Sequence, residues 1–487
     1  MIQHPNKKKA LIAGGGIAGL TAAVLLDEMG YRITLLEAKP TLGGRAYSFL
    51  DKKTGSPVDN GQHVMIGAYH ETIKLLERVG AKHTIKKLIP TRIPIKNNNN
   101  KTTYFCLRPL SFPFNLALAF LTFKGLSFKD KINLLKLAKE LHRIKTHKSQ
   151  PPKQITVQEW LKKFNQSKDA IQNFWDPLTL ATLNNSVDVA AAESLCQVFL
   201  KSYCEGKNDG LLIIPKKPLQ DVFANPISQY LHMRGHDIKL QARVTGISFL
   251  DHNVQSFTLS NGDTLKADLY ISAMPPQDLA RVLPKTFKDN HPPLSKLEQF
   301  QKSPIISVDL FYDQCIMTDD FIGSACTTFQ WFFRKTTNKG LCHVTGLISG
   351  AHNLLDNDKK DLIATAQNDL AYIYPKAKTA KLIHALAHRE RGATIHCHHD
   401  DSDIRPKQKQ TDNFYIVGDW TQTHLPPTIE SATKSAQLMC DDLLETWILL
   451  AKNIENTHKE HIQEIKEEEK ARVRYLVFKI ASKFLKF

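Results

Sequence analysis

Gly14, Gly16 and Gly19 have the spacing of a phosphate-binding turn, because they follow a short apolar run and precede a helical stretch. Gly14 permits a tight turn, Gly16 leaves bare backbone for a pyrophosphate, and Gly19 lets the helix approach the strand closely. Ile17 and Ala18 begin the helix, whose positive N-terminal end would attract phosphates. These five residues are therefore predicted to bind the phosphates of a dinucleotide.

A carboxylate that could select the nucleotide comes eighteen residues after the last of these glycines. Glu37 closes the second apolar run and is followed by Ala38. A carboxylate in this place accepts hydrogen bonds from a ribose diol and repels a 2′-phosphate. The pattern favours FAD or NAD over NADP, with Glu37 and Ala38 at the adenosine end.

A second turn of related design lies near the C-terminus. An apolar run ends in Gly418 and Asp419, and "LPPTIESA" follows as the entry to another helix, starting at about Thr428 and Ile429. The N-terminus of a helix stabilises negative charge, so this turn could also face a ligand. The sequence thus has two such sites about four hundred residues apart.

Gly43, Gly44 and Arg45 follow the acid by six residues and resemble the Gly-Gly-Arg of the amine oxidase and carotenoid desaturase superfamily of flavoproteins. The resemblance implies one extended FAD held at both ends. The small residues would let the loop pass close to the flavin end, and Arg45 would neutralise the pyrophosphate. Asp419 would meet the ribityl and phosphate region, and the helix from Thr428 would point at the flavin. A surface salt bridge for Arg45 and a turn cap for Asp419 are the alternatives.

The same resemblance places the backbone of Val244 over the adenine and Gly61 near the flavin. Two strand-like runs on either side of an Asn-Gly-Asp turn at residues 261–263 are predicted to return the chain to the FAD-binding sheet. The predicted fold class is α/β, with a discontinuous Rossmann-like FAD-binding domain of the Gly-Gly-Arg type and an inserted α+β substrate domain. The predicted boundaries are residues 1–80, 210–285 and 405–450 for the FAD-binding parts, 81–209 for a helical part that faces substrate or membrane, 286–404 for the sheet and helices of the substrate domain and 451–487 for a C-terminal basic amphipathic extension.

Longer stretches resemble the hydroxysqualene dehydroxylases, the squalene-associated FAD-dependent branch of this superfamily. They include "VDNGQHVMIGAYHETIKLLERVGA" (58–81), "FWDPLTLATLNNSVDVAAAE" (174–193), "RERGATI" (389–395) and "GDWTQTHLPPTIESATKSA" (418–436). The resemblance implies reduction of the C30 isoprenoid hydroxysqualene to squalene, on the bacterial route to hopanoids. An allylic alcohol that loses water leaves a delocalised cation, which hydride from reduced flavin would quench in a dry, apolar pocket.

Such a reaction needs an acid that protonates the leaving hydroxyl. His63 is the first candidate because it follows the segment of Gly61, and Asp176 is the reserve. A hydrogen-bonding structural role for His63 and a helix-capping role for Asp176 are the alternatives. The chain has no second Gly-x-Gly-x-x-Gly motif, so an external electron donor is expected to reduce the flavin.

Other functions are compatible with the same motifs. A carotenoid desaturase would share the cofactor, the fold and an apolar substrate, but would transfer hydride to the flavin. A non-catalytic isoprenoid carrier, as in the Rab GDP-dissociation inhibitors, would share the architecture without flavin, although Glu37, Arg45 and Asp419 argue against it. An amine oxidase is less favoured, because no aromatic pair accompanies the Gly-Asp turn beyond Trp420.

The net charge of 65 − 48 = +17 invites an anionic partner. Nucleic acid is not expected, because basic and aromatic residues are not interleaved on a platform. Residues 470–487 hold six Lys/Arg and no acid, which predicts a basic amphipathic helix on an anionic membrane or, alternatively, a helix packed on the protein itself. Residues 110–123 are apolar and uncharged, which is compatible with a buried helix, a tunnel wall or a shallow dip into a membrane.

The chain lacks both an apolar run of eighteen residues and the apolar core of a signal peptide. A cytoplasmic protein, peripheral on the inner face of the cell membrane, is therefore expected. The eight cysteines lack Cys-x-x-Cys spacing and are expected to be free thiols. The segment "IHCHHDD" (395–401) is expected to be a loop rather than a metal site, because neighbouring side chains of an extended segment point to opposite faces.

Overall fold

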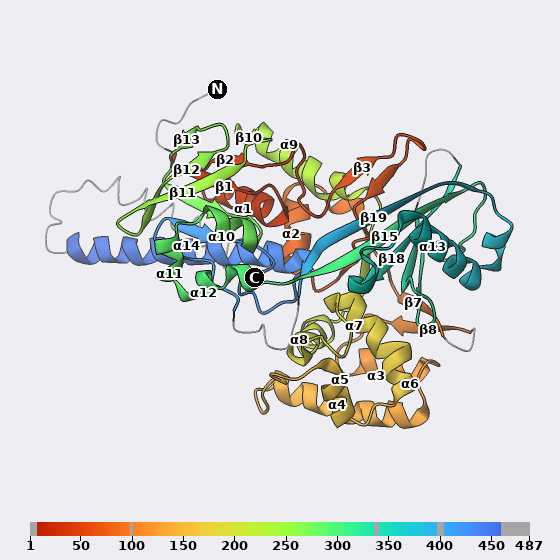
Figure 1. The fold of residues 1–487 in the computed structure, drawn as a ribbon. Coiled ribbons are helices and arrows are strands. Elements are labelled where there is room, and N and C mark those ends of the chain that lie inside the picture. The colour runs from red at the N-terminus through yellow and green to blue at the C-terminus, as the bar shows by residue number, and fades with distance from the viewer. Residues whose placement is uncertain (1–6, 98–100, 336–339, 397–403, 459–487) are drawn as a thin grey trace.

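The computed structural model describes residues 7–97, 101–335, 340–396 and 404–458. Figure 1 shows three regions: a parallel sheet with its helices near the N-terminus, a second sheet beside it, and a helical unit below both. The predicted membrane helix at residues 470–487 lies outside the described residues, as does most of the predicted loop at 395–401.

The first sheet is fully parallel and has the strand order β10–β2–β1–β14–β20. Four of its strands are short apolar runs that are mostly buried, as parallel strands covered on both faces require, whereas β10 at the edge is mostly exposed. The strands are Asp237–Lys239, Arg32–Leu36, Lys9–Ala13, Leu269–Ser272 and Phe414–Ile416. Three distant parts of the chain thus build one sheet, which confirms the predicted discontinuous α/β arrangement.

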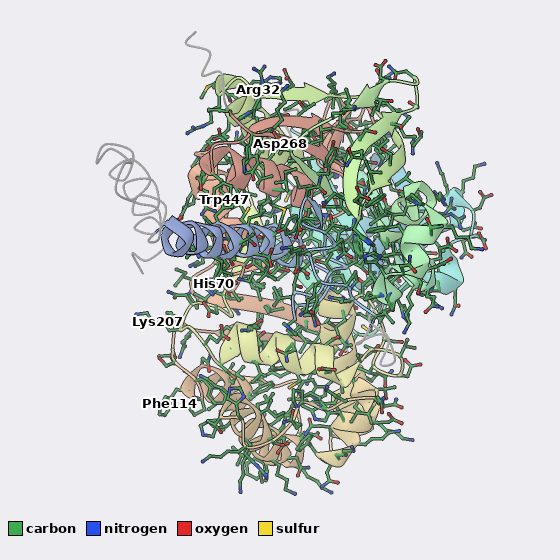
Figure 2. The ribbon with its side chains drawn as sticks, turned by 90° about the vertical axis from the view of Figure 1, so that its left-hand side faces the viewer. Arg32, His70, Phe114, Lys207, Asp268 and Trp447 are labelled. Atoms are coloured by element: carbon green, nitrogen blue, oxygen red, sulfur yellow. The ribbon has the colours of Figure 1, made fainter. Side chains whose placement is uncertain are left out.

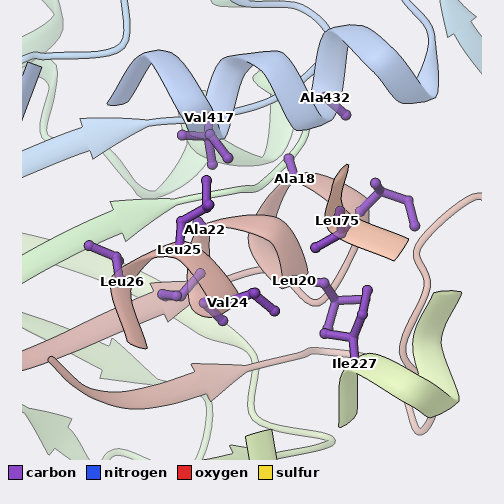
Figure 3. Packing of buried hydrophobic residues seen from close by; sticks show 14 of the residues in the cluster. Ala18, Leu20, Ala22, Val24, Leu25, Leu26, Leu75, Ile227, Val417 and Ala432 are labelled. Atoms are coloured by element: carbon purple, nitrogen blue, oxygen red, sulfur yellow. The ribbon is translucent and has the colours of Figure 1, made fainter. Parts of the chain in front are cut away.

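Two helices pack against each other on one side of this sheet (Figure 3). Helix α1 (Ile17–Glu28) follows β1, and helix α14 (Ile429–His458) follows β20. Figure 3 shows Ala18 and Ala22 of α1 directed toward α14, where small side chains allow a close approach. Helix α14 runs past residue 450, where one domain boundary was predicted, and it contains no Gly or Pro that would interrupt it. The predicted domain boundaries stay predictions.

An antiparallel three-stranded sheet, β11–β12–β13, lies beside the parallel sheet. The predicted Asn-Gly-Asp turn joins β12 to β13, which confirms the turn. The strands are Val244–Leu250, Asn253–Leu259 and Thr264–Leu265. The helices of this neighbourhood are α9 (Asn225–Met233), α10 (Pro276–Val282), α11 (Lys285–Asp289) and α12 (Pro292–Ser295).

The second large sheet has seven strands in the order β19–β15–β18–β17–β16–β7–β8. Helix α13 (Lys359–Ile373) covers one face, against which Ile306, Val308 and Leu310 are buried. Alternate residues of the strands point to the opposite face. The strands are Leu382–Ile395, Lys302–Tyr312, Cys342–Ser349, Trp331–Lys335, Phe321–Ser324, Thr91–Lys96 and Thr102–Leu107.

The helical unit packs around a cluster of aromatic side chains. Phe105 of β8 and Phe120, Phe123 and Phe174 of the helices have ring centroids 5.2–5.6 Å apart. The helices are α3 (Phe114–Thr122), α4 (Phe128–Lys145), α5 (Val157–Lys163), α6 (Lys168–Ala170), α7 (Asp176–Leu183) and α8 (Ala192–Tyr203). Helix α3, within the apolar segment 110–123, is a surface helix that is buried on one face only, and its exposed face is also largely apolar.

Small elements connect these regions. Strands β3 (Ser48–Leu50) and β4 (Pro57–Asp59) form a hairpin, and helix α2 (His70–Arg78) begins soon after β5 (Met65–Ile66). Strands β9 (Leu212–Pro215) and β6 (Ile85–Lys87) complete a three-stranded sheet with β5. None of the helices in the described part of the chain has the length and apolar character that crossing a bilayer requires. The cysteines of the described part are free thiols.

Candidate functional site

The N-terminal glycine turn has the close contacts that its spacing predicts. Gly14 has a φ of +115°, and a Cβ there would lie 2.6 Å from the carbonyl oxygen of Ala273. A Cβ on Gly19 would lie 1.9 Å from the carbonyl oxygen of Gly14. At Gly16 the nearest atom would be Cα of Gly44 at 3.8 Å, so this part of the turn is open. The backbone at the start of α1 therefore has room for a phosphate, which fits a dinucleotide.

The side chain of Glu37, which follows the second strand, hydrogen-bonds to the backbone of this turn. Its buried carboxylate accepts hydrogen bonds from the backbone N–H of Gly15 at 2.6 Å and of Lys39 at 2.8 Å. Each carboxylate oxygen has a second lone pair, so Glu37 could also accept a hydroxyl hydrogen bond of a ribose. Its predicted role and its structural role are compatible.

The segment that carries Val244 lies beside the same carboxylate residue. The carbonyl oxygen of Glu37 accepts the N–H of Ala242 at 2.8 Å, and its own N–H donates to the carbonyl oxygen of Lys239 at 2.9 Å. Val244 is buried in one cluster with Leu36. Glu37, Ala38 and Val244, the residues predicted at the adenosine end, are therefore neighbours in space.

A second glycine loop presses against the first. The N–H of Gly43 donates to the carbonyl oxygen of Gly15 at 2.9 Å, and a Cβ on Gly44 would lie 2.9 Å from Cα of Gly16. Both Gly43 and Gly44 have positive φ angles, of 106° and 63°. The contact needs glycine at position 44, and it places Arg45 next to the open part of the first turn.

Arg45 and Asp419, predicted to act at different parts of one cofactor, pair with each other. Arg45 Nη2 lies 2.7 Å from Asp419 Oδ1 although 374 residues separate them. Arg45 Nη1 also donates to the carbonyl oxygen of Ala393 at 3.1 Å. The carboxylate of Asp419 raises the pKa of Arg45, so the guanidinium stays charged. The Asp419 side chain is only 6% exposed, whereas that of Arg45 is 43% exposed, so the pair is partly open to water and the role of Arg45 toward a cofactor stays a prediction.

Side chains of α14 hold the turn of Gly418 and Asp419 in place. Ser435 Oγ accepts the N–H of Gly418 at 3.0 Å, and Ser431 Oγ donates to the carbonyl oxygen of Asp419 at 3.2 Å. Trp420 Nε1 donates to the carbonyl oxygen of Met274 at 3.2 Å. Ser431 and Ser435 were not predicted as supporting residues, although both lie in the stretch that carried the family resemblance.

The start of α14 is tied to the start of α2. Thr428 Oγ1 accepts the N–H of Ser431 at 3.2 Å, which caps α14 before its first residue, Ile429. The phenol of Tyr69, the residue before α2, hydrogen-bonds to Thr428, and burial raises the pKa of Tyr69 to about 12. Thr428 and Ile429 therefore lie at a helix N-terminus, as predicted.

Glu430 of α14 also hydrogen-bonds to the start of α2. Its carboxylate accepts the N–H of Glu71 at 2.9 Å and both the N–H and the hydroxyl of Thr72, at 3.0 and 2.7 Å. These donors are at the positive end of α2, where a carboxylate is favourable. Burial raises the pKa of Glu430. The side chain thus orients α14 from outside the predicted site.

His63, the first candidate for the catalytic acid, lies between β4 and β5, two residues after Gly61. Loss of hydration lowers the pKa of this half-buried imidazole to about 4. Asp59 acts in the opposite direction, whereas Arg45 and Lys335 lower the pKa further. The imidazole is therefore neutral near pH 7, which is less suited to donating a proton than the charged form would be. Its catalytic role stays a prediction.

Charged residues of the second sheet reach this segment. Lys335 Nζ lies 2.8 Å from Asp59 Oδ2, and Asn60 Nδ2 donates to Glu390 Oε2 at 3.1 Å. Burial by itself would raise the pKa of Asp59, but Lys335 and neighbouring donors bring it below the ordinary value. Asn60 and Glu390 belong to motifs that carried the resemblance, whereas nothing in the sequence around Lys335 indicated a contact with the site.

The segment of His63 also contacts an apolar cluster. Phe321, Phe333 and Leu347 of the second sheet form its buried part, and Val64 packs against it. The further members are Leu88, Ile93, Leu212, Ile305 and Trp331. Residues 59–64 thus contact both charged and apolar side chains of the second sheet.

Asp176, the reserve candidate, begins α7 in the helical unit. Its carboxylate accepts the N–H of Val187 at 3.0 Å, and burial raises its pKa. Asp176 is at the start of α7, and the end of this helix lies about 12 Å away along its axis. That end contacts the second sheet, where Asn184 Nδ2 donates to Thr394 Oγ1 at 3.0 Å. The hydrogen bond of Asp176 runs to the turn after α7 rather than to the first turn of the helix, which has no side-chain cap, so the structure does not show the capping role considered as the alternative. The catalytic role of Asp176 stays a prediction.

Comparison with known proteins identifies the family. A model of the flavin-containing amine oxidoreductases matches residues 17–444. The chain belongs to this family. Hydroxysqualene dehydroxylase of Zymomonas mobilis is 26% identical over 434 residues, which are 88% of this chain and 97% of that protein. Zeta-carotene desaturase of Arabidopsis thaliana is 25% identical over 330 residues, which are 63% of this chain and 57% of that protein.

Solved structures share the fold. An oxidoreductase from Methanosarcina mazei superposes with a TM-score of 0.70 at 17% identity, covering 89% of this chain and 100% of that one. Cyclohexylamine oxidase from Brevibacterium oxydans superposes with a TM-score of 0.64 at 14% identity, covering 90% and 100%. Together with the open glycine turn and the Arg45–Asp419 pair, family membership makes the chain an FAD-dependent oxidoreductase. In the described residues, no group of three or more His, Cys, Asp or Glu side chains is placed to hold a metal ion.

Proposed function

We propose that this oxidoreductase reduces hydroxysqualene to squalene. The observation that supports this most is the extent of its likeness to hydroxysqualene dehydroxylase, which spans 97% of that relative. The apolar cluster of Phe321, Phe333 and Leu347 beside the predicted cofactor loops is also suited to a hydrocarbon substrate.

Residues from both ends of the chain would hold one FAD molecule. Gly14, Gly16 and Gly19 would face its pyrophosphate, Glu37 its ribose, and the pair of Arg45 and Asp419 the phosphate and ribityl part. When bound and reduced, FAD would supply hydride, and an external electron donor would have to provide the two electrons that reduce it. In the proposed reaction, protonation of the substrate hydroxyl releases water, and hydride then completes squalene at the allylic carbon.

The chain's own task in this reaction is to exclude water from the cation and to deliver one proton. The apolar cluster performs the first task. His63 and Asp176 are the proposed donors for the second: His63 is next to the cluster through Val64, whereas Asp176 has the pKa shift that favours a protonated carboxyl. Substituting each residue by itself separates the two assignments.

The proposal is tested by anaerobic incubation of the dithionite-reduced protein with hydroxysqualene, followed by product analysis. Squalene, formed in proportion to the reduced flavin, is the expected product. Oxidised protein with hydroxysqualene is the control and should give none. If the reduced, FAD-loaded protein leaves hydroxysqualene unchanged, the substrate assignment is wrong while the family assignment stands.

A carotenoid desaturase activity is the second candidate, because zeta-carotene and phytoene desaturases are also among the relatives. The same experiment decides between the two when the oxidised protein is incubated with phytoene. Desaturated products together with bleaching of the flavin absorbance would favour this second activity, in which electrons flow from substrate to flavin.

A further inference from the structure

The outer surface of the helical unit exposes an unusual concentration of apolar side chains. Six of the fifteen exposed large hydrophobic side chains of the described residues lie between residues 110 and 135. Phe114 and Leu121 of α3 are each 69% exposed, and Phe128 and Leu135 of α4 are 79% and 68% exposed. Figure 2 shows Phe114 at the outer edge of the unit. Single exposed apolar residues are ordinary, but such a cluster indicates a binding surface.

Helices α3 and α4 present these side chains together. Lys131 Nζ donates to the carbonyl oxygen of Leu121 at 3.0 Å, and the rings of Phe112 and His142 stack at 6.5 Å. The end of α3 thus meets the start of α4, and the start of α3 approaches the end of α4. Both helices bury their other faces in the same aromatic cluster, so their exposed faces point away from it. We call the exposed side chains of Leu110, Phe114, Leu121, Phe128, Ile132 and Leu135 the apolar patch.

The charge around the apolar patch is strongly positive. Residues 121–148 contain eight Lys/Arg and two acids, a net charge of 8 − 2 = +6. Both acids are engaged within the protein: Asp130 is buried and binds Ser127 and Ser167, and Glu140 accepts the hydroxyl of Ser149. On α4, the exposed Lys129, Lys136 and Lys139 stand beside the apolar residues. The positive charge of this surface is therefore not neutralised by its own acids.

We propose that the apolar patch docks on an anionic lipid bilayer, with its Phe and Leu side chains in the interface and its lysines on the lipid headgroups. Amphipathic helices with Lys on the polar side and Phe or Leu on the other bind membranes in this way. A second copy of the chain is a poorer occupant, because it would bring two segments of +6 charge together. This proposal is independent of the reaction and of the C-terminal residues 470–487.

Vesicle sedimentation of the full-length protein tests the proposal. The probes are vesicles of phosphatidylcholine alone and of phosphatidylcholine with phosphatidylglycerol. The Phe128→Ser/Leu135→Ser variant should partition about tenfold or more weakly onto the anionic vesicles, because two interfacial side chains are lost. The Met233→Ser/Leu250→Ser variant is the matched control, since these side chains are 77% and 60% exposed on other elements, and it should bind as the unaltered chain does.

Two further measurements keep the result unambiguous. FAD absorbance and thermal melting should be unchanged in both variants, which shows that the fold is intact. A Lys479→Glu/Lys483→Glu/Lys486→Glu variant measures the contribution of the C-terminal segment in the same assay, and it should retain binding through the apolar patch.

Unchanged vesicle binding of the Phe128→Ser/Leu135→Ser variant would overturn the proposal. If the unaltered protein is a dimer and this variant dissociates it, the surface would be assigned to self-association instead. Equal binding to neutral and anionic vesicles would overturn the charged part of it.

Discussion

The chain builds two strand–turn–helix units whose turns adjoin in space, and it stabilises the two turns differently. The turn of Gly14 to Gly19 is shaped by backbone packing, in which a Cβ on Gly19 would lie 1.9 Å from a carbonyl oxygen. The turn of Gly418 and Asp419 is shaped by side chains, because Ser431 and Ser435 of α14 bind its backbone. The first turn depends on the absence of side chains, and the second depends on their presence.

Because of this difference, the first turn is easier to recognise from sequence than the second. Glycine spacing is local, so the first turn can be identified from six residues of sequence. The hydrogen bonds of the second turn join residues 12 and 17 positions apart, and its carboxylate pairs with an arginine 374 positions away. A strong test of the comparison is therefore to disturb each turn separately.

The largest effect is expected from Gly19→Val in the first turn. Its side chain would overlap the carbonyl oxygen of Gly14, so we expect a loss of about 3 kcal/mol or more of folding stability, with no FAD bound. Gly16→Ala is the matched variant: its Cβ has open space, so the protein should fold but lose FAD affinity. Flavin absorbance and thermal melting measure both. A yellow, stable Gly19→Val protein would contradict the backbone-packing account.

A pH profile of kcat/KM tests the role of His63 as the acid. If protonated His63 is the acid, only about a thousandth of it is charged at pH 7, because its pKa is lowered to about 4. The rate should then rise about tenfold for each pH unit from pH 7 down to pH 5, and His63→Ala should remove this rise. A profile that is flat in both proteins would exclude His63 as a titrating acid, whereas a rise that persists in His63→Ala would point to Asp176.

Breaking the Arg45–Asp419 pair should have a smaller effect. Asp419→Asn leaves the guanidinium without its partner, and we expect FAD binding to weaken by about 1–2 kcal/mol, because Arg45 remains partly exposed to water. Asp320→Asn, which breaks the exposed pair with Arg334, is the control and should leave FAD affinity unchanged. Titration of the apoprotein with FAD measures both. Equal affinities would show that the pair does not support the cofactor.

The smallest effect is expected from Ser435→Ala in the second turn. The buried N–H of Gly418 loses its acceptor, which should cost about 1 kcal/mol of stability. Ser295→Ala, at an exposed position of α12, should have no effect. Urea unfolding followed by tryptophan fluorescence is the measurement. If the two variants are equally stable, side-chain support of the second turn is unimportant.

Much of the fold and part of the site could be predicted from local pattern. The first strand, α1, the Asn-Gly-Asp turn and the start of α14 were all expected near their observed positions. The pairing of Arg45 with Asp419 was not expected, because each residue was assigned to its own part of the cofactor. Lys335 could not be found, because a single lysine has no spacing that identifies its partner.

The helical unit shows the same limit. The apolar content of residues 110–123 left a buried helix, a tunnel wall and a membrane contact open, because composition does not reveal which face is covered. The fold buries Leu116 and Ala119 and exposes Phe114 and Leu121 of the same helix. The aromatic cluster beneath α3 decides this orientation, and that cluster draws residues from β8, α3 and the segment before α7.

The sequence by itself determined where a nucleotide could bind and which family motifs surround it, because glycine spacing, strand runs and helix starts act over a few residues. Tertiary structure alone decided which charges meet, how far the pKa of His63 falls and which apolar faces stay exposed. These properties depend on burial and on distances between segments hundreds of residues apart, and no local pattern contains them.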